Sequence, residues 1–161
     1  SEAMGESTSA CVLDGTDIVY VLRISTRKIM RVSLGAGSRL PVYCTSMGRV
    51  LLSGMPEADA VQLLESAPRP AHTANTLTGL DDILREVRLA RQQGWCLVDQ
   101  ELEEGLISLA APVVGRNGQV LAAINLSGQA NRTDPDTMKA RMLGPLLQAA
   151  RDISLLLLNR A

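Results

Sequence analysis

Two long apolar segments in the second half of the chain are separated by a short polar turn. They cover residues 106–113 and 119–127, and Arg116-Asn117-Gly118 lies between them. An Asn-Gly pair between two apolar runs is a strong hairpin signal, because both residues tolerate a positive φ. Almost continuous Leu, Ile, Val and Ala is typical of strands buried on both faces. The pattern predicts a central antiparallel hairpin.

Three polar residues interrupt this apolar hairpin: Ser108, Asn125 and Ser127. A two-residue turn places Ser108 opposite Ser127, whereas a four-residue loop places it opposite Asn125. Both registers put the three residues on one face, because side chains alternate along a strand. Buried polar groups need hydrogen-bond partners. These residues therefore either satisfy each other and the backbone or bind a ligand.

Further strands are expected on both sides of a helical middle section. Residues 10–13 and 18–24 flank Asp14-Gly15-Thr16-Asp17, which predicts a second hairpin. Residues 28–34 are a third strand candidate. Residues 95–98 predict another strand, and an acidic turn over residues 99–105 leads from it into the central hairpin.

Helical spacing is clearest over residues 80–93, where apolar side chains recur every three or four positions and Gly94 ends the pattern. Thr45 or Ser46 can cap a helix over residues 47–53, and Pro56 can open another over 57–66. Residues 67–78 read as an exposed loop. Asp134-Pro135 begins a last helical region that we expect to break at Gly144-Pro145 and to resume until about residue 159.

The order of these elements predicts the fold class. Strands in hairpins, a helical excursion and a long final helix indicate an α+β domain with a mostly antiparallel sheet flanked by helices. Residues 155–158 are four consecutive leucines, which occupy every side of a helix. We expect them to meet another subunit or a neighbouring domain, with burial inside this domain as the alternative.

Composition narrows the function classes. The chain has 161 residues, a net charge of −1, one Trp, two Tyr and no Phe, which argues against a polyanion-binding field and against base-stacking platforms. Three cysteines and one histidine lack the spacing of a zinc site, so we expect no metal or cofactor and a reduced cytoplasmic setting. No membrane span is expected. Residues 1–9 read as a polar segment, and residues 10–161 as one domain.

Three local features were candidates for chemistry. The helix start at Cys44-Thr45-Ser46-Met47-Gly48 could seat a carboxylate, although every helix has such an end. The acidic residues Asp99, Glu101, Glu103 and Glu104 read as a solvated turn. A helix start can activate a thiol such as Cys44, but His72 lies in a remote loop. No nucleophile, base and orienting group come together, so we expect no enzyme.

Several motifs in order along the chain carry a family resemblance. They are Arg39-Leu40-Pro41-Val42-Tyr43-Cys44-Thr45-Ser46-Met47-Gly48-Arg49-Val50-Leu51-Leu52, Gly94-Trp95, Asp99-x-Glu101, Gly105, Ala110-Ala111-Pro112-Val113, Gly118 and Ala122-Ala123-Ile124-Asn125-Leu126-Ser127. Together they closely resemble the effector-binding domain of IclR-type bacterial transcription regulators. The motifs around Arg27, Tyr43 and Gln100 are most similar to regulators of protocatechuate, 4-hydroxybenzoate and β-ketoadipate breakdown.

The resemblance implies a GAF-like domain that binds a small organic acid and forms a homodimer or homotetramer. It also implies an N-terminal winged helix-turn-helix for DNA binding, which we expect to lie outside this chain. Alternatives are a sensor of a small 2-oxo acid such as glyoxylate or pyruvate, or a GAF-like enzyme that uses the Cys44 or Cys96 thiol. The pocket positions that the family implies are Ile29, Val32, Leu40, Ser46, Met47, Asp99, Leu106, Ser108, Asn125 and Ser127.

The residue pattern and the family resemblance together predict which part of the effector each pocket residue contacts. We expect the backbone N–H groups of Ser46 and Met47 to hold the effector carboxylate. The hairpin residues Ser108, Asn125 and Ser127 would bond its other oxygens. The apolar wall would come from Ile29, Val32, Leu40 and Leu106, and Arg31 or Arg49 would supply charge.

Overall fold

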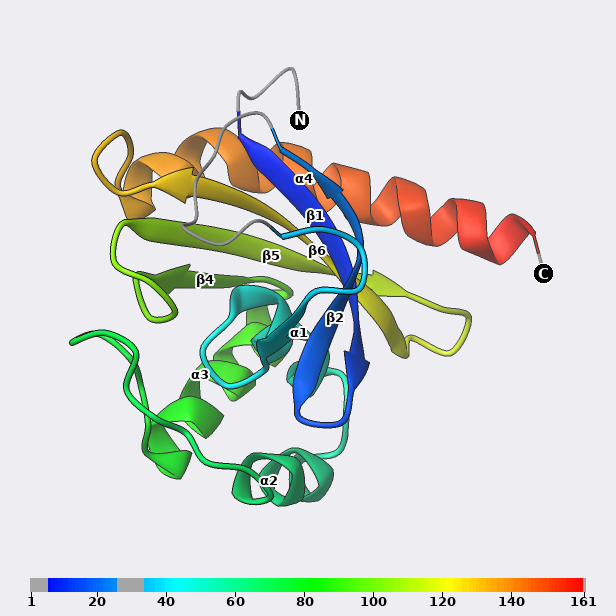
Figure 1. Cartoon of the computed structure of the whole chain (residues 1–161). Coiled ribbons are helices and arrows are strands. Elements are labelled where there is room, and N and C mark those ends of the chain that lie inside the picture. The colour runs from blue at the N-terminus through cyan, green and yellow to red at the C-terminus, as the bar shows by residue number, and fades with distance from the viewer. Residues whose placement is uncertain (1–5, 26–33, 161) are drawn as a thin grey trace.

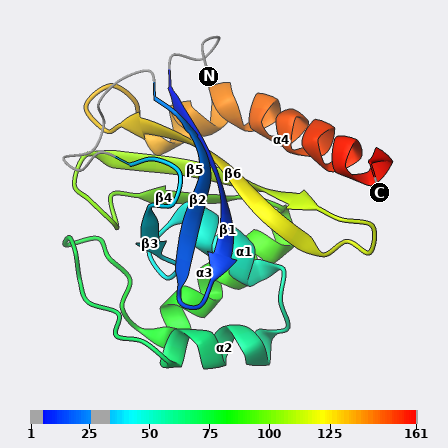
Figure 2. The ribbon, with the colours of Figure 1, turned by 45° about the vertical axis from the view of Figure 1, so that its right-hand side comes forward.

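The computed structural model describes residues 6–25 and 34–160, and its centre is one antiparallel sheet. The six strands lie in the order β3-β2-β1-β6-β5-β4, and every neighbouring pair is antiparallel. Helices α1, α2 and α3 lie on one side of the sheet, and α4 crosses the other side (Figures 1 and 2). The predicted α+β architecture is confirmed. The bounds are β1 Ser7–Asp14, β2 Asp17–Ile24, β3 Arg39–Pro41, α1 Ser46–Ser53, α2 Glu57–Glu65, α3 Leu80–Gln93, β4 Cys96–Asp99, β5 Leu106–Val114, β6 Val120–Gln129 and α4 Pro135–Asn159.

The predicted central hairpin is β5 and β6. Ser108 pairs with Ser127, which is the register of the two-residue turn. The loop itself is longer, and the extra residue is absorbed by a bulge between Val113 and Val114. Gly118 in this loop has φ 73°, a conformation that favours glycine.

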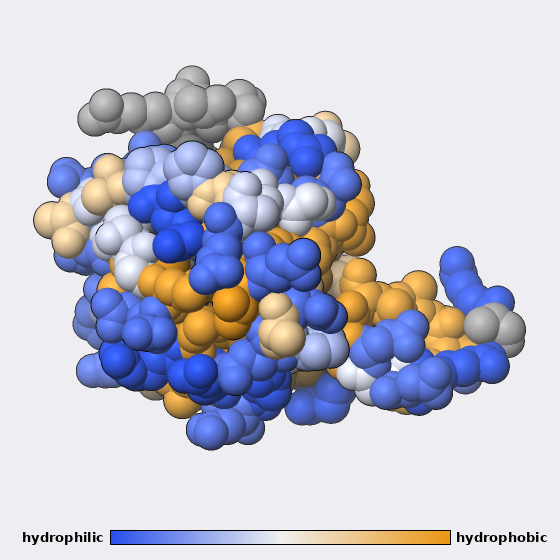
Figure 3. Space-filling model, turned by 90° about the horizontal axis from the view of Figure 1, so that it is seen from below, coloured by the Kyte–Doolittle hydropathy of each residue, from blue (hydrophilic) through white to orange (hydrophobic). Residues whose placement is uncertain are grey.

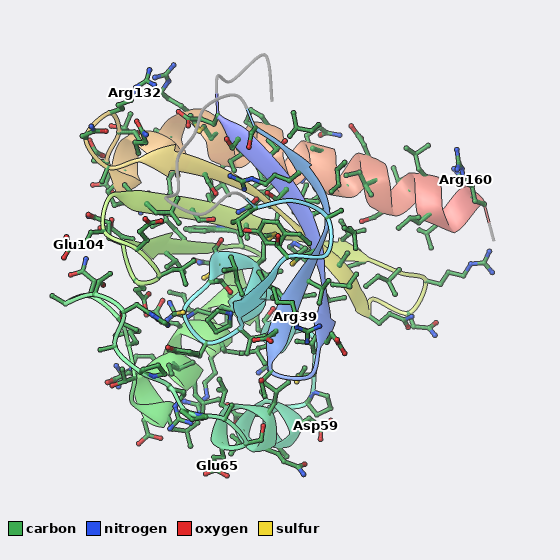
Figure 4. The ribbon with its side chains drawn as sticks, viewed as in Figure 1. Arg39, Asp59, Glu65, Glu104, Arg132 and Arg160 are labelled. Atoms are coloured by element: carbon green, nitrogen blue, oxygen red, sulfur yellow. The ribbon has the colours of Figure 1, made fainter. Side chains whose placement is uncertain are left out.

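The expected N-terminal hairpin is also present as β1 and β2, although β1 begins at Ser7, three residues earlier than predicted. The strand expected over residues 28–34 lies outside the described residues except for Leu34. The edge strand β3 was not predicted. Arg39 on β3 points toward the turn between β1 and β2 (Figure 4), where it forms ion pairs with Asp14 at 2.8 Å and Asp17 at 3.2 Å.

The predicted ends of α3 and the predicted last residue of α1 are confirmed, whereas α1 begins one residue earlier than predicted and α2 ends one residue earlier. The side chain of Thr45 caps α1, and Gly54 follows its last residue. Helix α3 spans the expected residues, and Gly94 ends it with φ 80°. The break predicted in α4 is wrong, because the helix continues through Pro145. Pro145 is exposed, and Met142, Leu146 and Ala150 on either side of it are buried against the sheet, which holds both halves in line.

The core consists of two layers, one on each face of the sheet. The layer between the sheet and α1 to α3 contains all three cysteines, with Met47, Leu52, Ile83 and Val87 among its fully buried members. The layer under α4 contains Ile107, Leu109, Leu126, Met138 and Met142. The two layers share the central hairpin, so that hairpin contributes to both.

The C-terminal end of α4 projects beyond the sheet (Figure 1). Leu155, Leu156 and Leu157 are 57%, 59% and 44% exposed there. Figure 3 shows apolar side chains along one side of this projection. Burial of the four leucines within the domain is therefore not observed, except in part for Leu158. No helix in the described part of the chain is long and apolar enough to cross a membrane.

Candidate functional site

A small cavity lies between the first turn of α1 and the centre of the sheet. Its volume is about 30 Å³. A water molecule needs about 10–15 Å³ on this measure, so the cavity has room for two or three. Its described wall contains no Asp, Glu, Lys, Arg or His. The lining residues are Ile18, Tyr20, Leu40, Cys44, Thr45, Ser46, Met47, Val98, Leu102, Leu106, Ser108, Asn125 and Ser127.

Four polar side chains form a connected cluster in this wall. The Ser46 and Ser108 Oγ atoms are 2.6 Å apart, which joins α1 to the central hairpin. Asn125 Nδ2 donates to Ser108 Oγ at 3.0 Å and to Ser127 Oγ at 3.1 Å. None of the four residues is more than 9% exposed. The Asn125 Oδ1 atom is buried and has no hydrogen-bond partner among the described residues.

The first turn of α1 lines the cavity, and the N–H groups of a first helical turn have no partner within their own helix. Thr45 accepts from Gly48 N at 3.3 Å and its hydroxyl donates to Pro41 O at 2.7 Å. In the described part of the chain, no partner is found for the N–H groups of Ser46 and Met47. Gly48 permits the close approach of the preceding segment, because a Cβ atom there would lie 2.2 Å from Val42 O.

A buried ion pair joins α1 to the acidic turn that follows β4. Arg49 donates to both carboxylate oxygens of Glu101 at 2.6 Å, and its side chain is 1% exposed. Arg49 Nε also donates to Tyr43 O at 3.1 Å. The interpretation of the acidic turn as solvated is therefore wrong for Glu101. Arg49 also does not supply charge to the cavity, because Glu101 neutralises it.

The loop over residues 67–78 is fastened to the same turn. Leu77 N donates to Glu101 Oε1 at 3.0 Å, and the Thr76 hydroxyl donates to Glu101 O at 2.6 Å. The Thr73 hydroxyl donates to Gln100 O at 2.6 Å. Gln100 itself has φ 57°, and its side chain accepts from Gly105 N at 2.9 Å, which stabilises the turn locally. The ion pair, the loop and α1 are thus one connected unit.

The cysteine chemistry that the sequence left open is not supported. Burial raises the pKa of the Cys44 thiol to about 12, and burial does the same for Cys11 and Cys96. A thiol with a raised pKa carries little nucleophilic thiolate at neutral pH. All three cysteines are buried and free. The helix start therefore does not activate Cys44.

The similarity of this chain to a known family shows what kind of protein carries this cavity. Residues 1–155 match the family model described as "Bacterial transcriptional regulator IclR C-terminal". The chain belongs to the IclR family. It is 41% identical over 154 residues to the Pca regulon regulatory protein of Pseudomonas putida, covering 95% of this chain and 53% of that protein. The chain thus spans about half the length of this relative.

Two further relatives are similar to this chain over most of its length. The p-hydroxybenzoate hydroxylase transcriptional activator of Acinetobacter baylyi is 33% identical over 150 residues, which is 90% of this chain and 55% of that protein. A crystal structure of the PobR inducer-binding domain from Acinetobacter, a double mutant in complex with 3-hydroxybenzoic acid, superposes with a TM-score of 0.83. It is 31% identical and covers 95% of this chain and 90% of that chain. These relatives are named as regulators, so the expectation that this IclR-family chain is not an enzyme is confirmed.

Most of the positions that the IclR resemblance implied come together at the cavity. Ile29 and Val32 lie outside the described residues, as does Arg31. Asp99 does not line the cavity. It follows Val98, which pairs with Ser108 and faces the cavity, so alternation directs Asp99 toward the opposite face. The seven positions found in the cavity wall are Leu40, Ser46, Met47, Leu106, Ser108, Asn125 and Ser127.

The sequence did not reveal several lining residues. Ile18 and Tyr20 come from β2, whose facing side follows from the pairing of Tyr20 with Cys11 on β1 and of Cys11 with Ala123 on β6. Periodicity within β2 alone cannot show which of its faces meets α1. Val98 and Leu102 are ordinary apolar residues beside an acidic turn, and nothing in their spacing marks them as lining residues.

Proposed function

We propose that this chain is the effector-sensing domain of a transcriptional regulator, and that the cavity under α1 binds a small aromatic carboxylic acid. The observation that carries the proposal is a connected polar cluster, with one unpaired acceptor, in the wall of a cavity whose described lining has no charged side chain. Relatives named for the Pca regulon and for p-hydroxybenzoate hydroxylase support the aromatic-acid class. In the complete regulator, a separate N-terminal domain binds DNA, and the protein acts in the cytoplasm as a homodimer or homotetramer.

The carboxylate is held by dipoles and hydrogen bonds. The N–H groups of Ser46 and Met47 point from a helix N-terminus, where the helix dipole favours an anion. The Ser46 hydroxyl lies beside them. Charged residues such as Glu104, Arg132 and Arg160 lie at the outer edges of the molecule (Figure 4). No charged side chain among the described residues lines the cavity to compete for the acid or to pair with it.

The ring requires more room than the cavity has. A cavity that binds benzene has a volume of about 150 Å³, against about 30 Å³ here. Met47 is 1% exposed and lines the cavity at the helix start. An unbranched methionine adopts other rotamers at low cost, so it is the side chain that we expect to move. Binding then favours an open arrangement of α1 over a closed one, which is the differential affinity that a sensor needs.

A thermal unfolding panel tests the proposal. The purified chain is heated with 4-hydroxybenzoate, protocatechuate, β-ketoadipate, glyoxylate or pyruvate. A ligand at a hundredfold its Kd adds about 2.7 kcal/mol to the free energy of unfolding, which raises Tm by several degrees. We expect the aromatic acids to raise Tm. A response to glyoxylate or pyruvate alone would contradict the aromatic class, and no response to any acid would contradict the sensor role.

A pair of variants locates the response. Ser46→Ala removes a hydroxyl from the cavity, and we expect it to reduce the Tm shift produced by the aromatic acid. Ser66→Ala is the control, because Ser66 follows α2, and its hydroxyl donates only to Leu63 O at 2.7 Å on an exposed surface. An equal reduction in both variants would place the binding site elsewhere.

A further inference from the structure

The hydrogens of the polar cluster can be counted. Asn125 has two N–H bonds, and both are used, one toward Ser108 Oγ and one toward Ser127 Oγ. Ser46 and Ser108 share one hydrogen bond across 2.6 Å, so one of their two hydroxyl hydrogens stays free whichever residue donates. Ser127 accepts from Asn125, which leaves its own hydroxyl hydrogen free.

The hydrogen-bonding groups that remain unpaired in this cluster are several donors and a single acceptor. The donors are one hydroxyl from the Ser46–Ser108 pair, the Ser127 hydroxyl and the N–H groups of Ser46 and Met47. The acceptor is Asn125 Oδ1. Among the described residues of the cavity wall, it is the only buried side-chain nitrogen or oxygen atom without a hydrogen-bond partner. A carboxylate uses donors and supplies none. A plain acid therefore satisfies the donors and leaves Asn125 Oδ1 unpaired.

The neighbouring strand does not supply the missing donor. Ser9 lies opposite Asn125 on β1, but no hydrogen bond joins the two side chains. Ser9 Oγ instead accepts from Arg23 at 3.1 Å. A water molecule in the cavity can donate to Asn125 Oδ1. A ligand that displaces such a water must replace its hydrogen bond or leave a buried acceptor unsatisfied.

We propose that Asn125 Oδ1 selects effectors that carry a hydrogen-bond donor in addition to the carboxylate, so that the effector is a hydroxylated aromatic acid. This inference rests on the proposed function of the cavity and adds a requirement to it. Benzoate, methoxybenzoates, β-ketoadipate and pyruvate at neutral pH offer acceptors only. They bind without satisfying Asn125 and are therefore disfavoured. An aminobenzoate offers a donor and is tolerated.

Isothermal titration calorimetry with matched ligands tests the inference. The purified chain is titrated with 3- and 4-hydroxybenzoate, with the corresponding aminobenzoates and methoxybenzoates, and with benzoate. For at least one ring position, we expect the hydroxy acid to bind between about 10-fold and about 100-fold more tightly than benzoate and its methoxy counterpart, the range expected for an unpaired buried acceptor. The aminobenzoate with its substituent at the same ring position should have an affinity closer to that of the hydroxybenzoate than to that of benzoate.

Two variants show whether Asn125 causes the discrimination. Asn125→Leu keeps a side chain of similar size without the acceptor, and we expect the hydroxy-to-benzoate affinity ratio to fall to about one. Ser127→Ala is the matched control. It removes a donor but keeps Asn125 Oδ1, so it weakens both ligands and leaves their ratio unchanged.

The outcomes separate the two proposals. Equal affinity of the wild-type chain for benzoate and both hydroxybenzoates would overturn the donor requirement while leaving the aromatic-acid sensor intact. A preference for the methoxybenzoates, or a ratio that survives in Asn125→Leu, would also overturn it. Binding of none of these acids would overturn the proposed function and the inference together. The wild-type ligand series alone decides the question if Asn125→Leu does not fold.

Discussion

The two faces of the central hairpin are equally buried but carry different side chains. Toward α4, β5 and β6 present Ile107, Leu109 and Leu126, which are at most 3% exposed. Toward α1, the same strands present Ser108, Asn125 and Ser127, which are at most 9% exposed. Solvent exposure therefore does not explain why one face is apolar and the other polar.

The difference separates stability from binding. An apolar side chain on the α4 face contributes to stability through burial and packing. An unpaired acceptor such as Asn125 Oδ1 costs about 1–3 kcal/mol, so the α1 face is less stable than an apolar face of the same shape would be. A ligand that donates a hydrogen bond to this group recovers that cost, as the proposed function requires. The comparison predicts that substitutions on the two faces have different consequences.

The largest effect is expected from Glu101→Ala, in the α1 layer. It leaves the Arg49 guanidinium buried without a partner, and the free energy of unfolding should fall by about 3–5 kcal/mol. Urea denaturation measures the loss. The double variant Arg49→Met with Glu101→Leu removes both charges and should recover most of the stability. A loss below about 1 kcal/mol in Glu101→Ala would show that the pair is not desolvated as the structure has it.

On the α4 face, Leu109→Ala should reduce the free energy of unfolding by about 2–5 kcal/mol, because it leaves a cavity in a closely packed layer. Leu109 points away from the candidate cavity, so effector affinity in the folded variant should change by less than about twofold. Denaturation and calorimetry on the same sample measure both quantities. A large loss of affinity would mean that the two faces are not independent.

Alkaline pH should act on the α1 layer alone. All three thiols lie in that layer, and burial raises their pKa from 9.0 to about 12. The unfolded chain therefore releases thiol protons at lower pH than the folded chain does. The protonated thiols therefore contribute a constant amount to the free energy of unfolding below pH 9. That amount is lost as pH rises from 9 toward 12, by roughly 1 kcal/mol per thiol at pH 10.

Cys96→Ala tests the origin of this pH dependence. The variant should show a smaller stability loss than the wild type between pH 8 and pH 10 in urea denaturation. Identical slopes in the two proteins would assign the alkaline loss to other groups.

The smallest effect on stability is expected from Ser127→Ala, about 1 kcal/mol or less, whereas affinity for the aromatic acid should fall about 10-fold. Ser154→Ala is the control on the other face. Both serines are 5% exposed. Ser154 donates to Ala150 O at 2.7 Å and accepts from Val114 N at 3.0 Å. Its loss should reduce stability and leave affinity unchanged, and equal affinity losses would contradict the division between the faces.

Local patterns were sufficient for the parts of the fold that depend on near neighbours. The shared face of Ser108, Asn125 and Ser127 follows from parity along two strands, and both possible turns give it. The ends of α3 follow from its apolar spacing and from Gly94. The helix start of α1 follows from its cap residue, Thr45.

Features that depend on distant partners were not predictable in this way. Glu101 has the sequence context of a solvated turn, and its burial depends on Arg49, 52 positions away. Tyr20 lies opposite Cys11, and Cys11 lies opposite Ala123 on β6, so two strand pairings between distant parts of the chain set the side of the sheet on which Tyr20 lies. Pro145 was expected to end a helix, but packing of its neighbours on the sheet outweighs the missing hydrogen bond. In each case, tertiary contacts override the local preference.

We propose that the α1 face of the sheet, and not the α4 face, binds the acid. Two-dimensional ¹H–¹⁵N NMR of the chain titrated with 4-hydroxybenzoate tests it most directly. We expect shifts in the backbone amides of Ser46 and Met47 and in the side-chain amide of Asn125, with smaller changes at Met138 and Met142 on α4. Shifts confined to α4, with Ser46, Met47 and Asn125 unchanged, would contradict it.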